Sequence, residues 1–226
     1  MPRPTPLFQD RHDAGRQLAH KLSEYANRPD AIVLGLPRGG VPVAYEVAIE
    51  LRLPLDVFIV RKLGVPGHEE LAMGAIASSD VSVINQGVIQ ELGISRAQID
   101  AVMQREREEL QRRERAYRGD RPPLQVEGKH AILVDDGLAT GASMYAAVLA
   151  LRQRNPVSII VAVPTAAPET CAAFEKAVEA IVCAHTPQPF LGVGMWYADF
   201  SQTTDEEVRE LLHKTAERRL ERNAWD

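Results

Sequence analysis

Short apolar segments alternate along the chain with longer stretches in which apolar residues recur every three or four positions. The short segments are typical of buried strands, and the longer stretches are typical of amphipathic helices. Strands separated by helices imply βαβ crossovers and a parallel sheet, so we expect an α/β protein. The expected strands are residues 32–34, 55–60, 131–134, 157–163 and 180–183, and the expected helices are residues 10–22, 41–51, 95–118, 168–178 and 204–222, with a further helix after residue 141.

Local signals define the starts of three helices. Asp10 is a suitable N-cap for the first helix, because its side chain can accept a hydrogen bond from a free backbone N–H group. Ser95 with Gln98, and Thr204 with Glu207, have the spacing of capping boxes. These signals favour helices that begin at the positions given by the apolar pattern.

Composition and charge limit the class of protein. The chain has 226 residues, which is enough to bury one substantial core. Its hydrophobic fraction of 45% and charged fraction of 25% are ordinary values for a globular protein. The formal net charge of -5 argues against a general nucleic-acid or anionic-membrane partner, although local basic loops can still bind small anions. We expect a compact enzyme with small-molecule ligands.

The cysteines and the N-terminal residues are not those expected of a secreted protein. Cys171 and Cys183 lie in or beside apolar segments and lack metal-ligand spacing, which favours reduced core thiols over a bridge or a zinc site. The N-terminal residues lack the apolar segment of a signal peptide, and the apolar runs, such as residues 159–163, are too short to span a bilayer. The expected location is cytoplasmic.

Residues 131–143 combine a strand with a candidate ligand site. The apolar start of this segment reads as a buried parallel strand, and Asp135 and Asp136 follow at its carboxyl end, where open α/β sheets bind ligands. The first N–H groups of the next helix, with the hydroxyls of Thr140 and Ser143, suit a phosphate dianion. Carboxylates instead suit sugar hydroxyls or a metal ion. The inferred ligand is a sugar phosphate, and the alternative is a buried strand with an acidic turn before an ordinary helix.

This segment resembles the phosphoribosyl-pyrophosphate (PRPP) motif of type I phosphoribosyltransferases, in which an apolar strand, two acids and a Thr/Gly-rich loop follow in that order. By position, the resemblance makes Asp135 and Asp136 the ligands of the ribose hydroxyls and of a magnesium ion, bound directly or through water. Ala142 stands where many members have a second glycine, and the loop should still close if the φ angle of Ala142 stays negative. The implied phosphate loop runs from Leu138 to Ser143, and the implied PRPP-binding residues of this segment after the acids are Gly137, Leu138, Ala139, Thr140, Gly141, Ala142 and Ser143.

The resemblance also implies a fold. Type I members have a three-layer α/β domain with a mostly parallel central sheet, helices on both faces, a small C-terminal hood and a flexible loop. We therefore expect a single phosphoribosyltransferase-like domain over residues 1–226. Its core would comprise residues 8–184, with a lid and insert at about residues 63–128 and the hood at about residues 185–226.

A glycine-rich turn, residues 35–40, follows the first expected strand. Gly39 and Gly40 permit close approach of backbone N–H groups to an anion, and Arg38 adds a permanent positive charge. Taken alone, such a turn can be only a tight connection. Beside the PRPP motif it resembles the family's pyrophosphate loop, which commonly holds a non-proline cis peptide bond. The resemblance therefore implies that Pro37, Arg38, Gly39 and Gly40 bind PRPP, with the cis bond between Pro37 and Arg38.

Arg61 and Lys62 form a basic pair at the end of the second expected strand. Two cations with no acid beside them suit a diphosphate, and several family members have Arg-Lys or Lys here that reaches PRPP. The alternative is a solvated basic pair. Residues 63–70 are polar and rich in Gly and Pro, as expected of a flexible lid that excludes water from the transition state. His68 is expected on the lid surface, and a catalytic role is its alternative.

The segment after the lid predicts a hairpin and a long helix. Residues 72–78 and 81–84 are two β-like segments separated by two polar residues, Ser79-Asp80, which predicts an antiparallel pair. The second half of the helix at 95–118 mixes charges of both signs densely. Such runs are usually solvated faces laced by i,i+4 ion pairs. The alternatives are a subunit contact, as in a homodimer, or a role in positioning the lid.

Residues 190–200 concentrate aromatic side chains in a chain whose aromatic fraction is only 5%. Trp196 and Tyr197 can stack on a planar base, and Asp199 can accept from a base N–H or contact magnesium through water. The segment is similar in style to the hood of purine-type members, although the registers do not align, and core packing of Trp196 and Phe200 is the alternative. Ala139 stands where members that use 6-oxopurines place an acid, which disfavours hypoxanthine or guanine as the acceptor.

The resemblance implies an activity in nucleotide metabolism, such as nucleoside salvage. The 5-phosphoribosyl group would pass from PRPP to a nitrogen acceptor, a nucleobase or a related compound, with Mg²⁺ as cofactor and release of pyrophosphate. The implied catalytic residues are Asp135, Asp136, Arg38 and Lys62. A second hypothesis is a non-catalytic regulator that senses PRPP or a nucleotide on the same fold. A third, an unrelated nucleotide-binding α/β enzyme, is disfavoured because no G-x-x-x-x-G-K-[ST] sequence occurs.

Overall fold

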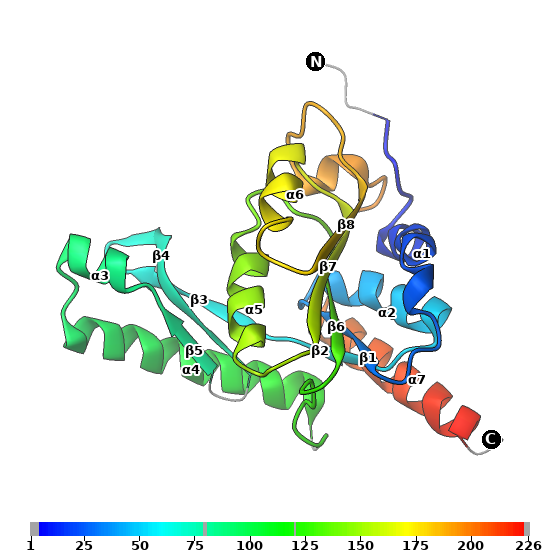
Figure 1. The fold of residues 1–226 in the computed structure, drawn as a ribbon, viewed down its shortest axis with the longest axis horizontal. Coiled ribbons are helices and arrows are strands. Elements are labelled where there is room, and N and C mark those ends of the chain that lie inside the picture. The colour runs from blue at the N-terminus through cyan, green and yellow to red at the C-terminus, as the bar shows by residue number, and fades with distance from the viewer. Residues whose placement is uncertain (1–4, 79–80, 120, 224–226) are drawn as a thin grey trace.

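A computed structural model describes residues 5–78, 81–119 and 121–223 of the chain. Its centre is a five-stranded sheet in the order β2-β1-β6-β7-β8, in which all neighbouring strands are parallel. Helices lie on both faces of this sheet (Figure 1), so the expected three-layer α/β fold is confirmed. The strands are β1 (Ala31–Gly35), β2 (Leu55–Val57), β6 (His130–Val134), β7 (Ser158–Thr165) and β8 (Ala180–His185).

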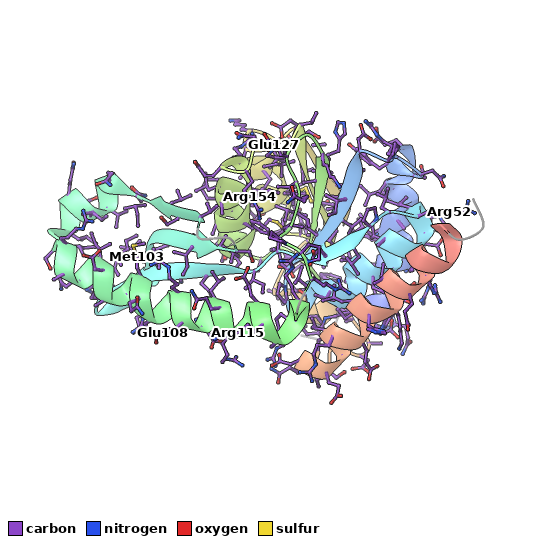
Figure 2. The ribbon with its side chains drawn as sticks, turned by 90° about the horizontal axis from the view of Figure 1, so that it is seen from below. Arg52, Met103, Glu108, Arg115, Glu127 and Arg154 are labelled. Carbon is purple, nitrogen blue, oxygen red and sulfur yellow. A yellow bond between two sulfur atoms is a disulfide. The ribbon has the colours of Figure 1, made fainter. Side chains whose placement is uncertain are left out.

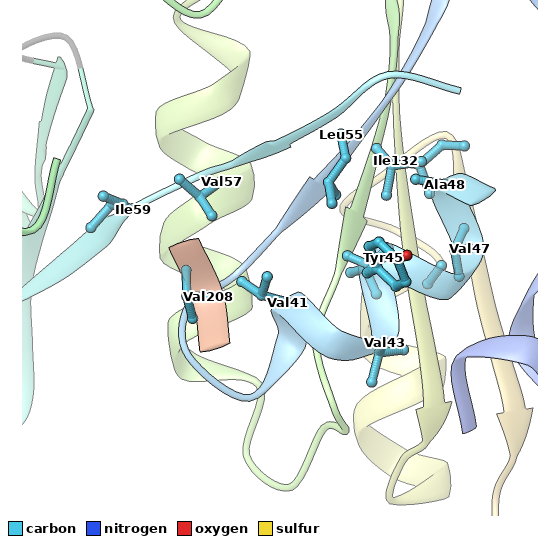
Figure 3. Packing of buried hydrophobic residues seen from close by; sticks show 14 of the residues in the cluster. Val41, Val43, Tyr45, Val47, Ala48, Leu55, Val57, Ile59, Ile132 and Val208 are labelled. Atoms are coloured by element: carbon cyan, nitrogen blue, oxygen red, sulfur yellow. The ribbon is translucent and has the colours of Figure 1, made fainter. Parts of the chain in front are cut away.

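The residues of β6 show why helices cover both faces of the central sheet. Ile132 and Val134 belong to one buried cluster, whereas Ala131 and Leu133 belong to a second cluster, because successive side chains of a strand point to opposite faces. Figure 3 shows part of the first cluster, where side chains of β2, β6, α2 and α7 pack together. The first face is covered by α1 (Arg11–Lys21), α2 (Gly40–Leu51) and α7 (Asp205–Asn223), and the second by α5 (Ala142–Arg152) and α6 (Pro168–Phe174).

A smaller antiparallel sheet of three strands projects from the central sheet (Figure 1). It contacts both α4 and α5, and α5 also contacts β7 of the central sheet. The expected hairpin is confirmed, because β4 pairs antiparallel with β5, although residues 79–80 between them lie outside the described residues. The elements of this part are β3 (Val60–Val65), β4 (His68–Ala77), β5 (Val81–Ile84), α3 (Gln86–Leu92) and α4 (Arg96–Arg118). Two 3₁₀ turns belong to other parts of the chain: η1 (Ser23–Tyr25) follows α1, and η2 (Val193–Trp196) follows β8.

The long helix α4 is amphipathic. It begins at the expected capping box, in which Ser95 Oγ accepts from the Gln98 backbone N–H and Gln98 Oε1 accepts from the Ser95 backbone N–H. Met103 packs against the apolar core, whereas Glu108 and Arg115 are exposed on the outer side of the helix (Figure 2). Within the described ranges, no helix is both long enough and apolar enough to cross a membrane.

One strand boundary next to the small sheet differs from the prediction. The second strand ends at Val57 rather than at residue 60. Residues 63–70, the expected flexible lid, form the turn of the hairpin between β3 and β4 together with the adjoining ends of both strands. Gly67 has a φ of 80° at its turn, a conformation that glycine adopts without a steric penalty. Pairing between the two strands satisfies backbone groups that an irregular loop would leave to water.

The prediction of reduced core thiols is also wrong, because Cys171 and Cys183 form a disulfide. Cys171 lies on α6 and Cys183 lies on β8, the next strand. Their Cα atoms are 6.6 Å apart, within the range that a disulfide bridges. The bridge joins a helix to the strand that follows it, and this proximity depends on the tertiary fold rather than on a recognisable cysteine spacing.

An ion pair connects α1 to α2. His12 Nδ1 lies 2.7 Å from Glu46 Oε1, and the side chain of His12 is 35% exposed. The hydrogen bond to Glu46 raises the pKa of His12 against the effect of burial, and the negative charges of Asp10 and Glu207 act in the same direction. The protonated form of His12 is therefore favoured in the folded protein.

We expect His12 to stabilise the protein at low pH more than at high pH. A histidine with a raised folded pKa contributes stability that is fully present below its unfolded pKa of about 6.5 and is lost as the pH rises through the folded pKa. Because His12 is partly exposed, His12→Gln should lower the free energy of unfolding by no more than about 1 kcal/mol at low pH, and by less at high pH.

Urea unfolding at about pH 5.5, below the unfolded pKa of about 6.5, and at about pH 9, well above that unfolded value, measures this difference. The matched control is His20→Gln, which changes an exposed histidine on the same helix. An equal loss of stability at both pH values would contradict the expected titration of His12.

Candidate active site

The two predicted ligand loops lie side by side. β1 and β6 are neighbouring parallel strands, and their last residues, Gly35 and Val134, are paired. Each strand continues through a short turn into a helix, α2 after β1 and α5 after β6. β2 lies on one side of this pair of strands, and β7 and β8 lie on the other. The loops therefore meet at the topological switch point of the sheet, where open α/β folds bind ligands.

The acid pair follows β6 directly. Asp135 Oδ1 accepts a hydrogen bond of 2.9 Å from the backbone N–H of Asp136. Burial raises the pKa of Asp135 well above its usual range, and the neighbouring charge of Asp136 raises it further. Burial also raises the pKa of Asp136, whereas the guanidinium of Arg11 acts to lower it. Carboxylates removed from water in this way are suited to ligand hydroxyls or to a cation, which replace the lost solvent contacts.

Gly39 and Gly40 pack directly against the two acids. A Cβ atom at Gly39 would overlap Asp136 Oδ2. A Cβ atom at Gly40 would lie 2.7 Å from the carbonyl oxygen of Val134 and 2.8 Å from the Cα atom of Asp135. The glycine turn and the acid pair therefore form one continuous surface, which a side chain at either glycine would disrupt.

The predicted phosphate loop ends at the N-terminus of α5. Gly141 has a φ of 72° and occupies the N-cap position, so it offers no side chain to the first N–H groups of the helix. Ala142 is the first helical residue, and its φ is not positive, which is the condition expected for closure of the loop. Thr140 and Ser143 are both exposed beside these N–H groups. The loop therefore has the features of an anion site at a helix N-terminus.

α6 supports this loop from behind. Thr170 Oγ1 donates a hydrogen bond of 2.6 Å to the carbonyl oxygen of Ala139. The ring of Phe174 lies so close to Gly141 that a Cβ atom there would be 2.7 Å from the ring. Leu138 is buried and forms a parallel bridge with Ala166. These contacts fix the loop between the sheet and α6.

Arg38 lies at the rim of the site. The Pro37–Arg38 peptide bond is cis, as the resemblance implies. Arg38 Nη1 is 3.7 Å from Asp205 Oδ1, and the side chain of Arg38 is 38% exposed. Asp205 also accepts a hydrogen bond of 2.7 Å from the hydroxyl of Tyr117. An exposed ion pair of this length contributes little stability, so Arg38 can exchange Asp205 for an anionic ligand at low cost.

Arg61 and Lys62 are neighbours in β3, so their side chains leave opposite faces of the strand. Arg61 Nη2 lies 2.6 Å from Glu106, a buried residue of α4. The assumption that no acid lies beside this basic pair is therefore wrong. Lys62 lines a hollow of 360 Å³ with Ala142 and Tyr145, next to the start of α5. The structure thus brings Lys62 toward the phosphate loop and pairs Arg61 with α4.

The predicted acceptor residues lie in the segment after β8. Trp196 is buried, and its indole Nε1 has no hydrogen-bond partner among the described residues. Tyr197 is also buried, its hydroxyl donates to the backbone carbonyl of Asp136 at 2.6 Å, and burial raises the pKa of this hydroxyl. Asp199 is exposed and accepts from the backbone N–H of Ser201 at 2.8 Å. The structure therefore joins Tyr197 to the acid pair, places Trp196 in the interior and leaves Asp199 at the surface.

Arg11 is a site residue that the sequence did not predict. Its Nε and Nη2 atoms both lie 2.9 Å from Asp136 Oδ2, and its Nη1 donates to the carbonyl oxygen of Ser201 at 2.6 Å. Its guanidinium carbon lies 4.0 Å from the centre of the Phe200 ring. Arg11 is the first residue of α1, where a positive charge opposes the helix dipole. No local signal marks Arg11 as a site residue, because Arg96 also begins a helix, α4, and does not contact the site.

Comparison with known proteins tests the resemblance over the whole fold. A family model described as "Phosphoribosyl transferase domain" matches residues 8–182, which include both ligand loops and the acid pair. The chain belongs to the phosphoribosyltransferase family. Membership of this family agrees with the glycine turn, acid pair and helix N-terminus that the chain places at one edge of its sheet.

Individual relatives agree with the family model. Two proteins of Mycobacterium tuberculosis, "Putative phosphoribosyl transferase MT0597" of strain CDC 1551 / Oshkosh and "Putative phosphoribosyl transferase Rv0571c" of strain ATCC 25618 / H37Rv, are each 45% identical over 208 residues. The match covers 92% of this chain and 47% of each relative, so the chain spans about half the length of these curated relatives. The crystal structure of TT1426 from Thermus thermophilus is 40% identical, has a TM-score of 0.82, and is matched over 92% of this chain and 98% of that one.

Proposed function

We propose that this phosphoribosyltransferase uses PRPP and Mg²⁺ to transfer a 5-phosphoribosyl group to a nitrogen acceptor, with release of pyrophosphate. The contact between the Gly39–Gly40 turn and the acid pair carries the proposal. A turn suited to an anion meets carboxylates suited to sugar hydroxyls at this contact. A ligand that fills both must combine a pentose with a phosphate group close to the ring, and PRPP has this arrangement.

The N-terminus of α5 supports the other end of the same ligand. Thr140 and Ser143 are exposed beside N–H groups that have no partner within the helix, and Lys62 lines the adjacent hollow. We assign the 5′-phosphate to this loop and the ribose to Asp135 and Asp136. The three parts of the surface then follow the order of the groups in PRPP: 5′-phosphate, ribose and pyrophosphate.

The acid pair fits a magnesium ion, although the described residues hold no cluster of three or more His, Cys, Asp or Glu side chains that could bind a metal alone. Mg²⁺ usually keeps several waters and binds through one or two carboxylates together with substrate phosphates. Asp135 and Asp136 supply such carboxylates, and their burial makes a neighbouring cation favourable. When bound, Mg²⁺ supplies positive charge that neutralises the diphosphate.

The proposed reaction requires mainly positioning by the protein. The bond between C1 of the ribose and a pyrophosphate oxygen breaks, and an acceptor nitrogen bonds to C1 from the opposite face, with inversion. Because positive charge develops near C1, Asp135 and Asp136 stabilise the transition state as well as orient the ribose. Arg38 and Lys62 neutralise the departing pyrophosphate, whereas Arg61, which leaves the other face of β3 and pairs with Glu106, has no part in this step as the strand is placed.

The acceptor site is proposed to lie between the acid pair and the hood. Tyr197 supports this location through its hydrogen bond to the carbonyl oxygen of Asp136. The buried Trp196 is assigned to the interior side of this site, and the exposed Asp199 to its outer rim. Ala139 provides no carboxylate to accept a proton from a 6-oxopurine. We therefore propose a nitrogen acceptor other than hypoxanthine or guanine.

A screen for pyrophosphate release tests the proposed function. The full chain is incubated with PRPP, Mg²⁺ and one nucleobase or small amine at a time, and pyrophosphate is measured by a coupled assay. We expect release that depends on both PRPP and at least one acceptor. Binding of PRPP without release for any acceptor would reject the transferase proposal and favour the alternative, a regulator that senses PRPP or a nucleotide.

A further inference from the structure

Arg11 connects three parts of the proposed phosphoribosyl site. Its guanidinium contacts Asp136 Oδ2, the carbonyl oxygen of Ser201 and the ring of Phe200. Its Nε atom would lie 3.3 Å from a Cβ atom at Gly39. The side chains of Arg11 and Asp136 are only 11% and 16% exposed. The largely buried guanidinium of Arg11 therefore contacts Asp136, which is assigned to the ribose, and the hood residues Ser201 and Phe200, and it lies beside the glycine turn at Gly39.

The chain around Arg11 ties it to the hood. Residues 7–9 pair with residues 196–199 through four backbone hydrogen bonds. α1 begins immediately afterwards, with Asp10 as the N-cap that accepts from the backbone N–H of Asp13 at 2.8 Å. The position of Arg11 is thus set by a hood segment on one side and by a capped helix on the other. A movement of the hood would move the contact with Asp136.

The geometry of the ion pair leaves part of Asp136 for a ligand. Both contacts from Arg11 end on Oδ2, so Arg11 does not use Oδ1. A charge-assisted pair with two N–H groups restricts the orientation of the carboxylate more than a single hydrogen bond does. A cation in the first turn does not favour α1 itself, because it opposes the helix dipole. The contact with Asp136 accounts for the placement of this cation.

We propose that Arg11 is a positioning residue, which orients the Asp136 carboxylate toward the ribose hydroxyls and joins it to the hood. This inference rests on the proposed function, because it takes Asp136 as a ribose ligand. It makes a selective prediction that a purely structural ion pair does not make. Ligands that contain ribose should depend on Arg11, whereas inorganic phosphate bound at residues 138–143 should not.

Two substitutions separate the charge of Arg11 from its shape. Arg11→Lys keeps the positive charge but loses the planar fork, and Arg11→Gln loses the charge. We expect both to weaken the binding of ribose 5-phosphate by about 10-fold or more, and to change the binding of inorganic phosphate by less than about twofold. Calorimetric titration of the full chain measures both ligands. The matched control is Arg16→Lys, which changes an exposed arginine of the same helix and should alter neither affinity.

A double-mutant cycle shows whether Arg11 acts through Asp136. In the Asp136→Asn background, Arg11→Lys should reduce the affinity for ribose 5-phosphate by much less than in the wild-type protein, because the carboxylate that Arg11 orients is absent. Thermal unfolding monitored by circular dichroism identifies any variant that does not fold. Additive effects in the cycle would overturn the proposed route through Asp136.

The outcomes distinguish this inference from the proposed function. If the wild-type protein binds neither PRPP nor ribose 5-phosphate, the proposed function fails. If it binds both, and the Arg11 variants bind ribose 5-phosphate equally well or more tightly, the positioning role is overturned. Equal losses for ribose 5-phosphate and inorganic phosphate would also overturn it, because a general distortion of the site gives that pattern.

Discussion

Replacing Asp135 with asparagine should remove most phosphoribosyl transfer. The amide has nearly the size of the carboxylate and can still accept the hydrogen bond from the Asp136 backbone N–H, but it carries no negative charge beside the ribose. We expect kcat/KM for PRPP to fall by at least about 100-fold, measured by pyrophosphate release with the best acceptor from the screen. Asp100→Asn, at an exposed position of α4, is the control and should leave the rate unchanged.

The same substitution should not weaken the fold at neutral pH. Burial raises the pKa of Asp135, so folding at neutral pH is opposed by the cost of burying its charge. For an acid with a raised folded pKa, this cost is absent below the unfolded pKa of about 4 and grows as the pH rises toward the folded value. Asp135→Asn should therefore match or exceed the wild-type stability above about pH 4 and lose that advantage below it. A loss of stability that parallels the loss of turnover would contradict this separation.

Gly40→Ala should disrupt the diphosphate turn. The added methyl group would lie 2.7 Å from the carbonyl oxygen of Val134 and 2.8 Å from the Cα atom of Asp135, and neither backbone atom can move without shifting β6. We expect the free energy of unfolding to fall by about 1–3 kcal/mol, as for other overpacked sites. The affinity for PRPP should fall by at least about 10-fold, because the turn no longer fits against the acids. Denaturant unfolding and calorimetry measure the two effects.

Gly87→Ala is the matched control for Gly40→Ala. Gly87 lies in α3, and a Cβ atom there would meet only the end of the Asn85 side chain, at 3.3 Å. We expect this change to alter the free energy of unfolding by less than about 1 kcal/mol and to leave PRPP binding intact. Wild-type stability and PRPP affinity in Gly40→Ala would show that the turn does not pack against the acids as described.

The central sheet could be predicted from the sequence because its strands are buried on both faces. β6 and β7 are continuous apolar runs, so periodicity identifies them without knowledge of their neighbours. The hairpin of β3 and β4 resembles a loop in the sequence because it contains glycine and polar residues and is partly exposed. The pattern of apolar residues does not reveal α3, which has seven residues, none of them buried, although Asn85 and Gly93 mark its two ends.

The candidate site also has parts that the sequence predicts and parts that only the fold reveals. The acid pair, the glycine turn and the phosphate loop each occupy a few consecutive residues, so their chemistry can be read locally. The pair of Arg11 with Asp136 joins residues 125 positions apart, and the pair of Arg61 with Glu106 joins residues 45 positions apart. Such contacts depend on how the helices pack, which no local pattern specifies. The sequence predicts Tyr197 as a stacking residue, but only the fold reveals its hydrogen bond to Asp136.

Calorimetric titration of the full chain with PRPP in the presence of Mg²⁺ is the most direct test of the proposed ligand surface. We predict saturable binding at one site per chain, competition by ribose 5-phosphate, and loss of this binding in Asp135→Asn. No detectable binding of PRPP or of any ribonucleoside monophosphate to the wild-type protein would contradict the assignment of these loops to a phosphoribosyl ligand.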